Sequence, residues 1–182
     1  MNIFKNWQDQ ESSVGRHLLF LVLGALIFPI SIPALLVILL PQVDKKIGMG
    51  SFFIGKGNII IGILFIFLGG VLAFWTIFPQ IKLASGTPFP MLPTKRLLIV
   101  GPFKYCRNPM TLGTLMAYAG IAVIVGSVAS LLFVVLFAMV LTAYIKLVEE
   151  KELELRFGTE YVDYKKVTPF IIHVRFASVK KK

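Results

Sequence analysis

Residues 95–113 of the chain read Lys-Arg-Leu-Leu-Ile-Val-Gly-Pro-Phe-Lys-Tyr-Cys-Arg-Asn-Pro-Met-Thr-Leu-Gly. Basic and turn-forming residues are concentrated here, whereas long stretches on either side are apolar. The segment leads into a helix, because Asn108 is a favoured N-cap residue and Pro109 is favoured at the first helical position. A polar, turn-rich segment between apolar helices indicates a site at a membrane surface.

Composition places the chain among integral membrane proteins. Of its 182 residues 57% are hydrophobic, and the mean hydropathy is +0.82, whereas the apolar share of soluble domains is roughly 45–50%. The length is that of one domain, so we expect a single domain over residues 1–182. The first apolar run is too long for the core of a signal peptide, so we expect it to remain in the mature protein.

Four apolar runs predict an all-α, polytopic membrane bundle. Residues 18–40 and 59–78 carry no charge and are long enough to cross a hydrocarbon core of ~30 Å. Residues 109–125 and 128–148 should form an antiparallel helix hairpin, because Gly126-Ser127 between them predicts a tight turn. Pro29 and Pro33 should kink the first helix and free carbonyls that another helix or a water must satisfy. Small residues that predict close helix packing are Gly62, Gly69, Gly70 and Ala73 in the second run and Gly113, Ala117 and Gly120 in the third.

The connections carry most of the charge. Residues 79–109 contain several prolines and are interpreted as a loop of about thirty residues folded against the bundle, because a continuous helix is implausible there. Residues 149–182 form a charged C-terminal segment. Only Lys45, Lys46 and Lys56 lie on the side of the membrane opposite to the other basic residues, so the positive-inside rule places both termini in the cytoplasm, at the cell membrane.

Two classes of function are disfavoured by the residue pattern. The net charge of +10 could suggest nucleic-acid binding, but the basic residues flank the apolar runs and are not interleaved with stacking aromatics. Cys106 is the only cysteine, and His17 and His173 stand far apart with no carboxylate at ligand spacing, so we expect no bound metal and no intrachain disulfide.

A helix hairpin would bring two polar patches to one face of the bundle. The free N-terminus of the third helix suits a carboxylate or a phosphate, and Glu149 or Glu150 suits ribose hydroxyls or a cationic amine. S-adenosylmethionine carries groups of all these kinds, although an anionic lipid headgroup would satisfy the loop equally well. Lys146 and Glu150 are four residues apart and could form an ion pair on the helix, as could Glu152 and Arg156.

Two motifs resemble a known enzyme family. Gly101-Pro102-Phe103-Lys104-Tyr105-Cys106-Arg107-Asn108-Pro109-Met110-Thr111-Leu112-Gly113 is followed, after the hairpin, by Glu149-Glu150 and then by Phe157-Gly158-Thr159-Glu160-Tyr161-Val162-Asp163-Tyr164. Their order and spacing resemble the isoprenylcysteine carboxyl methyltransferase family and its bacterial relatives. That family is similar in turn to the membrane phospholipid N-methyltransferases.

The resemblance implies an S-adenosylmethionine-dependent membrane methyltransferase with a cytoplasmic cofactor pocket. Arg107 would hold the acceptor as the catalytic residue, and the acceptor would be a membrane lipid or a hydrophobic, lipid-like small molecule. No glycine-rich loop after a strand is present, so the soluble dinucleotide-type fold is not expected. The residues that would bind the cofactor are Lys95, Leu97, Leu98, Phe103, Asn108, Pro109, Met110, Thr111, Glu149 and Glu150.

Two departures from the family pattern leave the acceptor open. Asn108 stands where the family has a histidine, and Thr111 stands where it has a tyrosine. The sequence Asn108-Pro109-Met110 resembles the phospholipid N-methyltransferases more closely than the isoprenylcysteine enzymes. The leading hypothesis is methyl transfer to a lipid-like or hydrophobic small molecule, whose methyl-accepting group could be a carboxylate. The alternatives are headgroup N-methylation of a phospholipid, in which Glu149 helps to deprotonate the amine, and a non-catalytic lipid-binding protein on the same scaffold.

Overall fold

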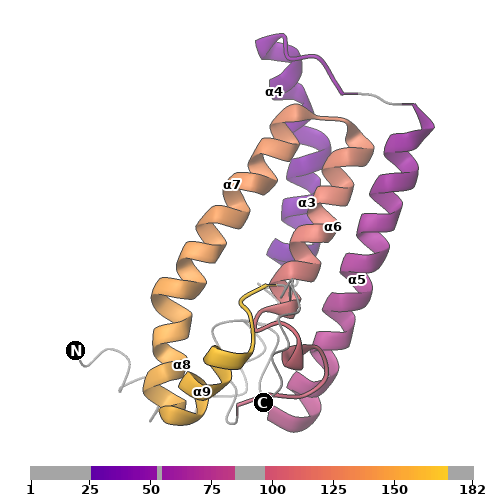
Figure 1. The fold of residues 1–182 in the computed structure, drawn as a ribbon. Helices are drawn as coiled ribbons and strands as arrows, with labels where there is room; N and C mark the ends of the chain where they lie inside the picture. The colour runs from indigo at the N-terminus through magenta and orange to yellow at the C-terminus, as the bar shows by residue number, and fades with distance from the viewer. Residues whose placement is uncertain (1–25, 53–54, 85–96, 172–182) are drawn as a thin grey trace, which may run out of the picture.

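The computed structural model describes residues 26–52, 55–84 and 97–171, and all regular elements in these ranges are helical. The first helix is built from the π-helical turn η1 (Ile27–Ser31), α3 (Ile32–Ala34), the π-helical turn η2 (Leu35–Leu39) and α4 (Leu40–Ile47). α5 (Lys56–Ala84) packs against α6 (Pro109–Val125), and the short 3-10 helix η3 (Gly101–Lys104) precedes α6. α7 (Val128–Tyr144), η4 (Ile145–Glu149) and α8 (Glu150–Phe157) form one long helix, and α9 (Thr159–Val167) folds back beside α8 (Figure 1).

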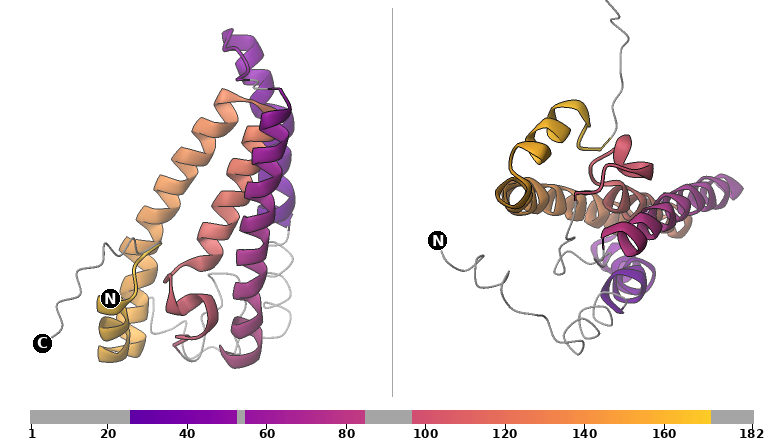
Figure 2. Two further views of the ribbon diagram at one scale, coloured as in Figure 1. Left: turned by 45° about the vertical axis from the view of Figure 1, so that its right-hand side comes forward. Right: turned by 90° about the horizontal axis from the view of Figure 1, so that it is seen from below.

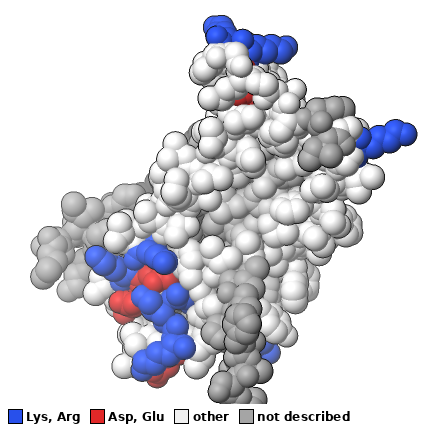
Figure 3. All heavy atoms as spheres, turned by 45° about the horizontal axis from the view of Figure 1, so that its top comes forward, with Lys and Arg blue, Asp and Glu red and all other residues white. Residues whose placement is uncertain are grey.

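The helices have the length and composition of membrane spans. Ile27–Ile47, Lys56–Gln80 and Val128–Phe157 are each apolar and long enough to cross a bilayer, and Pro109–Val125 is a shorter apolar helix. Figure 3 shows charged side chains at the ends of the bundle, with an uncharged surface between them on the face in view. The predicted all-α membrane bundle is therefore confirmed.

α5 is longer than the sequence predicts. The expectation that the chain leaves its helix at Pro79 is wrong, because α5 continues through Pro79 to Ala84. Proline is tolerated inside membrane helices, where neighbouring helices and local adjustments compensate for the missing N–H, and Pro79 is buried here. The part of the predicted loop at residues 85–96 lies outside the described residues.

The first helix differs from its prediction at its C-terminal end. It was expected over residues 18–40; residues 18–25 lie outside the described ranges, and the helix continues past residue 40 to Ile47. Pro29 lies inside the π-helical turn η1, whereas Pro33 and Pro41 follow η1 and η2. In these turns the Ile32 N–H bonds to the Ile27 carbonyl and the Leu40 N–H to the Leu35 carbonyl. The next residues in this ladder are Pro33 and Pro41, which have no N–H to donate.

Hydroxyl groups from two other helices compensate for the two missing donors. Tyr118 Oη of α6 donates a hydrogen bond to the Phe28 carbonyl at 2.6 Å, and Ser130 Oγ of α7 donates one to the Leu36 carbonyl at 2.8 Å. These are the carbonyls that Pro33 and Pro41 would otherwise bond in the π register. The expectation that Pro33 frees a carbonyl for another helix to satisfy is thus confirmed.

α5 and α6 approach each other through glycines. A methyl group on Gly120 would lie 2.6 Å from the Gly62 carbonyl oxygen, and one on Gly113 would lie 2.6 Å from the Gly69 carbonyl oxygen. Gly70 has no such neighbour within 4 Å. The predicted close packing is confirmed for these two glycine pairs, which bring the start of α6 against α5.

At the end of the bundle away from α8, a buried polar cluster holds the turn between α6 and α7. Asp44 of α4 is 5% exposed and accepts hydrogen bonds from Ser127 Oγ at 2.6 Å and from the Ala129 N–H at 2.9 Å. Ser127 also caps α7 by accepting the Ser130 N–H, and Gly126 adopts a positive φ of 67° that favours glycine. The turn between α6 and α7 is therefore held by several hydrogen bonds. From this turn, the long helix of α7 and α8 diverges from α6 along its length (Figure 2).

Candidate active site

A cavity of about 660 Å³ lies between the helices at the α8 end of the bundle. Its walls come from the first helix, α5, the segment before α6, α6 itself, the α7 to α8 helix and α9. Glycines and apolar side chains dominate, and the polar groups are clustered where the start of α6 faces the end of the long helix. A cavity of this size and character is typical of a small-molecule site.

The structure brings the residues singled out by the sequence to this one cavity. Residues of both motifs, and two leucines just before the first motif, line the cavity although they are far apart in the chain: Leu97, Leu98, Phe103, Arg107, Asn108, Pro109, Met110, Thr111, Glu149 and Glu150. Lys95 lies outside the described residues. The hairpin therefore places the two polar patches together, while the role of each residue stays a prediction.

The N-terminus of α6 opens onto the cavity without a side-chain cap. Asn108 is the N-cap residue, but its side chain makes no capping hydrogen bond, and its backbone lies outside the helical region at φ −126° and ψ 58°. Pro109 fills the first position and needs no partner for an N–H. The N–H groups of Met110 and Thr111 belong to the first turn, which has no intrahelical acceptors, so this end of the helix suits an anion.

A buried network of opposite charges surrounds Glu150. Its carboxylate is 5% exposed, with Oε1 2.8 Å from Nη1 of Arg107 and Oε2 2.7 Å from Nζ of Lys165 on α9. The Arg107 contact is a close ion pair whose atoms are not aligned as a hydrogen bond, and Arg107 Nε has no partner in the described part of the chain. The expected local pairing of Lys146 with Glu150 is wrong, because the tertiary partners occupy both carboxylate oxygens.

Glu149, the neighbour of Glu150, has a different environment. It lines the cavity and is half-buried. Within residues 26–52, 55–84 and 97–171, it has no ion-pair or hydrogen-bond partner. The expected pair of Glu152 and Arg156 is confirmed at 3.7 Å. The two adjacent glutamates are therefore not equivalent, since the charge of Glu150 is compensated and that of Glu149 is not.

Two tyrosines of α9 complete the wall near Arg107. Tyr161 is 2% exposed and forms a hydrogen bond with Arg107. Burial, and to a smaller extent the charge of Glu150, raises the pKa of Tyr161 to about 12, so its phenol is neutral at physiological pH. Tyr164 is 5% exposed and donates to the Phe103 carbonyl at 2.6 Å. Neither tyrosine was among the predicted site residues. α9 reaches the cavity because the chain reverses at Gly158, between α8 and α9, and the direction of that turn could not be predicted from the sequence.

Gln80 is a further lining residue that sequence reasoning missed. It follows Pro79 in α5, and its Oε1 is buried without a hydrogen-bond partner among the described residues. An unpaired buried acceptor costs free energy unless a ligand or a water supplies a donor. The available signal was a lone polar side chain at the end of an apolar run.

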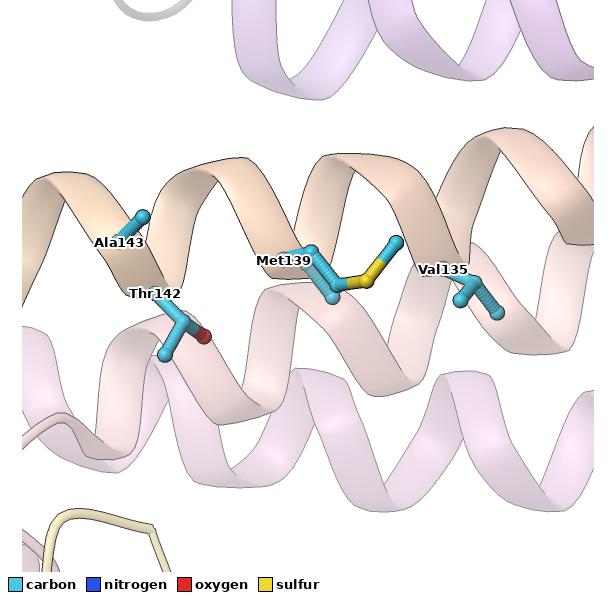
Figure 4. Close-up of a pocket in the computed structure, with 5 residues that line it drawn as sticks. Val135, Met139, Thr142 and Ala143 are labelled. Atoms are coloured by element: carbon cyan, nitrogen blue, oxygen red, sulfur yellow. The ribbon is translucent and has the colours of Figure 1, made fainter.

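A second hollow lies on one face of α7 and carries no charged group. It is lined by Val135, Ala138, Met139, Thr142 and Ala143. Figure 4 shows four of these side chains, Val135, Met139, Thr142 and Ala143, on a single helix. Its surface is almost entirely apolar. A hollow of this kind on a membrane helix is suited to lipid acyl chains rather than to chemistry.

Comparison with known proteins assigns the family. The model for the phospholipid methyltransferase family matches residues 58–160, which is more than half of the chain and includes most of the cavity lining. No curated protein and no solved structure matches the chain. The predicted resemblance to isoprenylcysteine carboxyl methyltransferases is confirmed in part: the family that matches is related to them, but membership of their own family is not shown. The chain belongs to the phospholipid methyltransferase family and is a membrane methyltransferase that uses S-adenosylmethionine.

Proposed function

We propose that this protein transfers a methyl group from S-adenosylmethionine to the amine of a phospholipid headgroup. The family match supports a phospholipid acceptor. The observation that carries the choice of an amine is the uncompensated carboxylate of Glu149 in the cavity wall. A carboxylate acceptor, which was the leading hypothesis from the sequence, would be repelled by the same group.

The cavity fits the cofactor in size and in the placement of polar groups. Its volume of about 660 Å³ lies within the usual range of ~300–1,000 Å³ for small-molecule sites. Arg107 Nε and the N–H groups at the start of α6 are donors suited to the carboxylate of the cofactor. Gln80 Oε1 is an acceptor suited to a hydroxyl or an amine. Phe103, Leu97 and Leu98 supply apolar surface.

The charges in the lining favour a cationic acceptor. Three glutamates and two arginines line the cavity, so the carboxylates outnumber the guanidinium groups by one. Arg107 pairs with Glu150, and Arg156 pairs with Glu152, which leaves Glu149 to attract the positive charge of a headgroup ammonium. Because the surrounding walls are largely apolar, this attraction is stronger than it would be in water.

The chemistry requires a proton acceptor. S-adenosylmethionine supplies a methyl group on a positively charged sulfur, and methyl transfer breaks the S–C bond while the electron pair stays on sulfur. An ammonium group has no lone pair, so it must lose one proton before its nitrogen can form the new N–C bond. Glu149 accepts that proton and passes it to water, and the helices align the amine and exclude bulk water.

Labelled-methyl transfer tests the proposal. The purified protein is incubated with methyl-labelled S-adenosylmethionine and mixed micelles that contain phosphatidylethanolamine, and the lipid fraction is then treated with alkali. An N-methyl group survives as non-volatile product, whereas a methyl ester releases volatile methanol. We expect the label to be alkali-stable.

Glu149→Gln tests the role of the carboxylate, with Glu160→Gln as the control at an exposed glutamate of α9. We expect Glu149→Gln to lower kcat by about a hundredfold or more, as loss of a general base does, and to retain binding of S-adenosylhomocysteine in calorimetry. Loss of that binding would instead assign Glu149 to the cofactor. An alkali-labile label would restore the carboxylate acceptor, and a folded protein that binds no S-adenosylhomocysteine would favour the lipid-binding scaffold.

The orientation in the membrane is part of the proposal. With both termini in the cytoplasm, the cavity opens on the cytoplasmic side, where S-adenosylmethionine is made and used. A topology reporter fused after Lys182 should therefore read as cytoplasmic.

A further inference from the structure

We propose that Lys165 of α9 is a positioning residue of the active site, which fixes Arg107 through Glu150. This inference rests on the proposed function only in taking the cavity as the site of methyl transfer. The family match ends at residue 160, and Lys165 lies beyond it. The role is inferred from the contacts of this chain alone.

Lys165 reaches the buried carboxylate from the outer side. Its Nζ is 2.7 Å from Glu150 Oε2 and 2.9 Å from Glu154 Oε1. Glu150 Oε1, the other oxygen of the same carboxylate, faces Arg107 at 2.8 Å. Because each oxygen of Glu150 has its own cation, the carboxylate is fixed in rotation as well as in place. Removing Lys165 would leave one oxygen of a buried carboxylate without a counter-charge, and the carboxylate would turn toward Arg107.

The Arg107 side chain depends on this arrangement because few other groups hold it. It is 10% exposed, contacts Tyr161 and lies 5.8 Å from the centre of the Phe170 ring. It directly precedes the N-cap residue of α6. A shift of Glu150 would therefore move both the guanidinium group in the cavity wall and the start of the helix that faces the cofactor.

Residues 159–170, which we call the α9 segment, tie the same loop at three further points. Tyr164 bonds the Phe103 carbonyl. The Arg107 N–H donates to the Pro169 carbonyl at 3.0 Å, and Cys106 Sγ donates to the Phe170 carbonyl at 3.4 Å. The view from below in Figure 2 shows α9 and the loop before α6 at the same end of the bundle. The α9 segment thus covers the loop, and Cys106 lies beneath it.

Lys166 provides a matched control one residue away. It pairs with Asp163 at 2.8 Å, but these side chains are 68% and 72% exposed, whereas that of Lys165 is 37% exposed and its partner Glu150 is buried. Exposed pairs of the Lys166 kind contribute little to stability. The same substitution at the two lysines therefore separates an effect on the site from a general loss of charge in α9.

The experiment measures S-adenosylhomocysteine affinity by calorimetry and the rate of Cys106 alkylation by a maleimide, in folded, detergent-purified protein. Cys106 is the only cysteine, so alkylation reports the cover over the loop without an added probe. We expect Lys165→Met to weaken binding and to speed alkylation, each by about tenfold, which corresponds to about 1.4 kcal/mol. Lys165→Arg should restore both values, and Lys166→Met should resemble the wild type.

A double-substitution test shows whether Lys165 acts through Glu150. In a Glu150→Gln background, Lys165→Met should have little further effect on affinity, because the buried charge that Lys165 compensates is absent and only its exposed pair with Glu154 is lost. If Lys165→Met does not yield folded protein, Lys165→Gln takes its place in every comparison. Equal affinities for the Lys165 and Lys166 variants, or an undiminished effect in the Glu150→Gln background, would overturn the inference. A wild type that binds S-adenosylhomocysteine but methylates no lipid would overturn the proposed function instead and leave these comparisons intact.

Discussion

The hydrogen bond from Tyr118 to the Phe28 carbonyl should be worth more than its chemistry alone suggests, because Pro33 has removed the backbone donor that this carbonyl would use. Tyr118 is 4% exposed and the oxygen atoms are 2.6 Å apart. Tyr118→Phe removes only the hydroxyl and with it the hydrogen bond to the part-buried Phe28 carbonyl. We expect a loss of about 1 to 1.5 kcal/mol in the free energy of unfolding, toward the upper end of side-chain hydrogen bonds measured in membrane proteins.

Replacing the proline should abolish this cost. In Pro33→Ala the restored N–H can donate to the Phe28 carbonyl if the π turn persists. If the turn relaxes to an α-helix, the Ile32 N–H takes that carbonyl instead. In either case Tyr118→Phe should cost less than about 0.5 kcal/mol in the Pro33→Ala background. The two substitutions are thus predicted to be coupled by about 1 kcal/mol.

Reversible unfolding by sodium dodecyl sulfate in mixed micelles, followed by tryptophan fluorescence, measures the four variants of this cycle. Tyr144→Phe is the control, because Tyr144 is 45% exposed and has no hydrogen bond within the described ranges. An equal cost of Tyr118→Phe with and without Pro33 would refute the reasoning, since it would show that the carbonyl does not depend on the missing backbone donor.

Two further predictions concern stability. Gly120→Ala should cost about 1 to 3 kcal/mol, because its methyl group would meet the Gly62 carbonyl, whereas Gly70→Ala, which meets nothing within 4 Å, should unfold like the wild type in the same titration. Burial raises the pKa of the Cys106 thiol and that of Tyr161, the latter to about 12, so the folded state favours both protonated forms. Stability should be fully present below the ordinary thiol pKa of about 8.5 and should fall as the pH rises above it; a Cys106→Ala variant whose stability fell equally at pH about 9 to 10 would contradict the thiol contribution.

The membrane helices could be predicted largely from apolar runs and turn residues. Residues 109–125 were predicted to the residue, because Asn108-Pro109 and Gly126-Ser127 are strong local signals at its two ends. The start of α7 at Val128 was also predicted to the residue, whereas the ends of the first helix and of α5 were less visible. Pro79 suggested a loop, but in a bilayer the helix is the only way to satisfy the backbone, and α5 continues through it.

The residues that form the site could also be predicted, but not which of their charged side chains form ion pairs. Sequence order placed Glu149 and Glu150 together and opposite Arg107, and the structure brings all three to one cavity. Local spacing suggested Lys146 as the partner of Glu150, whereas Arg107 and Lys165 take that place. The difference between the two glutamates depends on the direction of each side chain on a helix and on where α9 folds back, and neither is encoded in local spacing.

The carbonyls that Pro33 and Pro41 leave open have a consequence for biogenesis. The first helix is synthesised before α6 and α7, yet its Phe28 and Leu36 carbonyls obtain their donors from Tyr118 and Ser130 of that later hairpin. Until the hairpin is inserted, these two carbonyls lack the hydroxyl donors that they have in the folded protein. We therefore expect the N-terminal half to be unstable in the membrane by itself. The newly made chain should become resistant to the quality-control proteases of the membrane once α7 has been inserted.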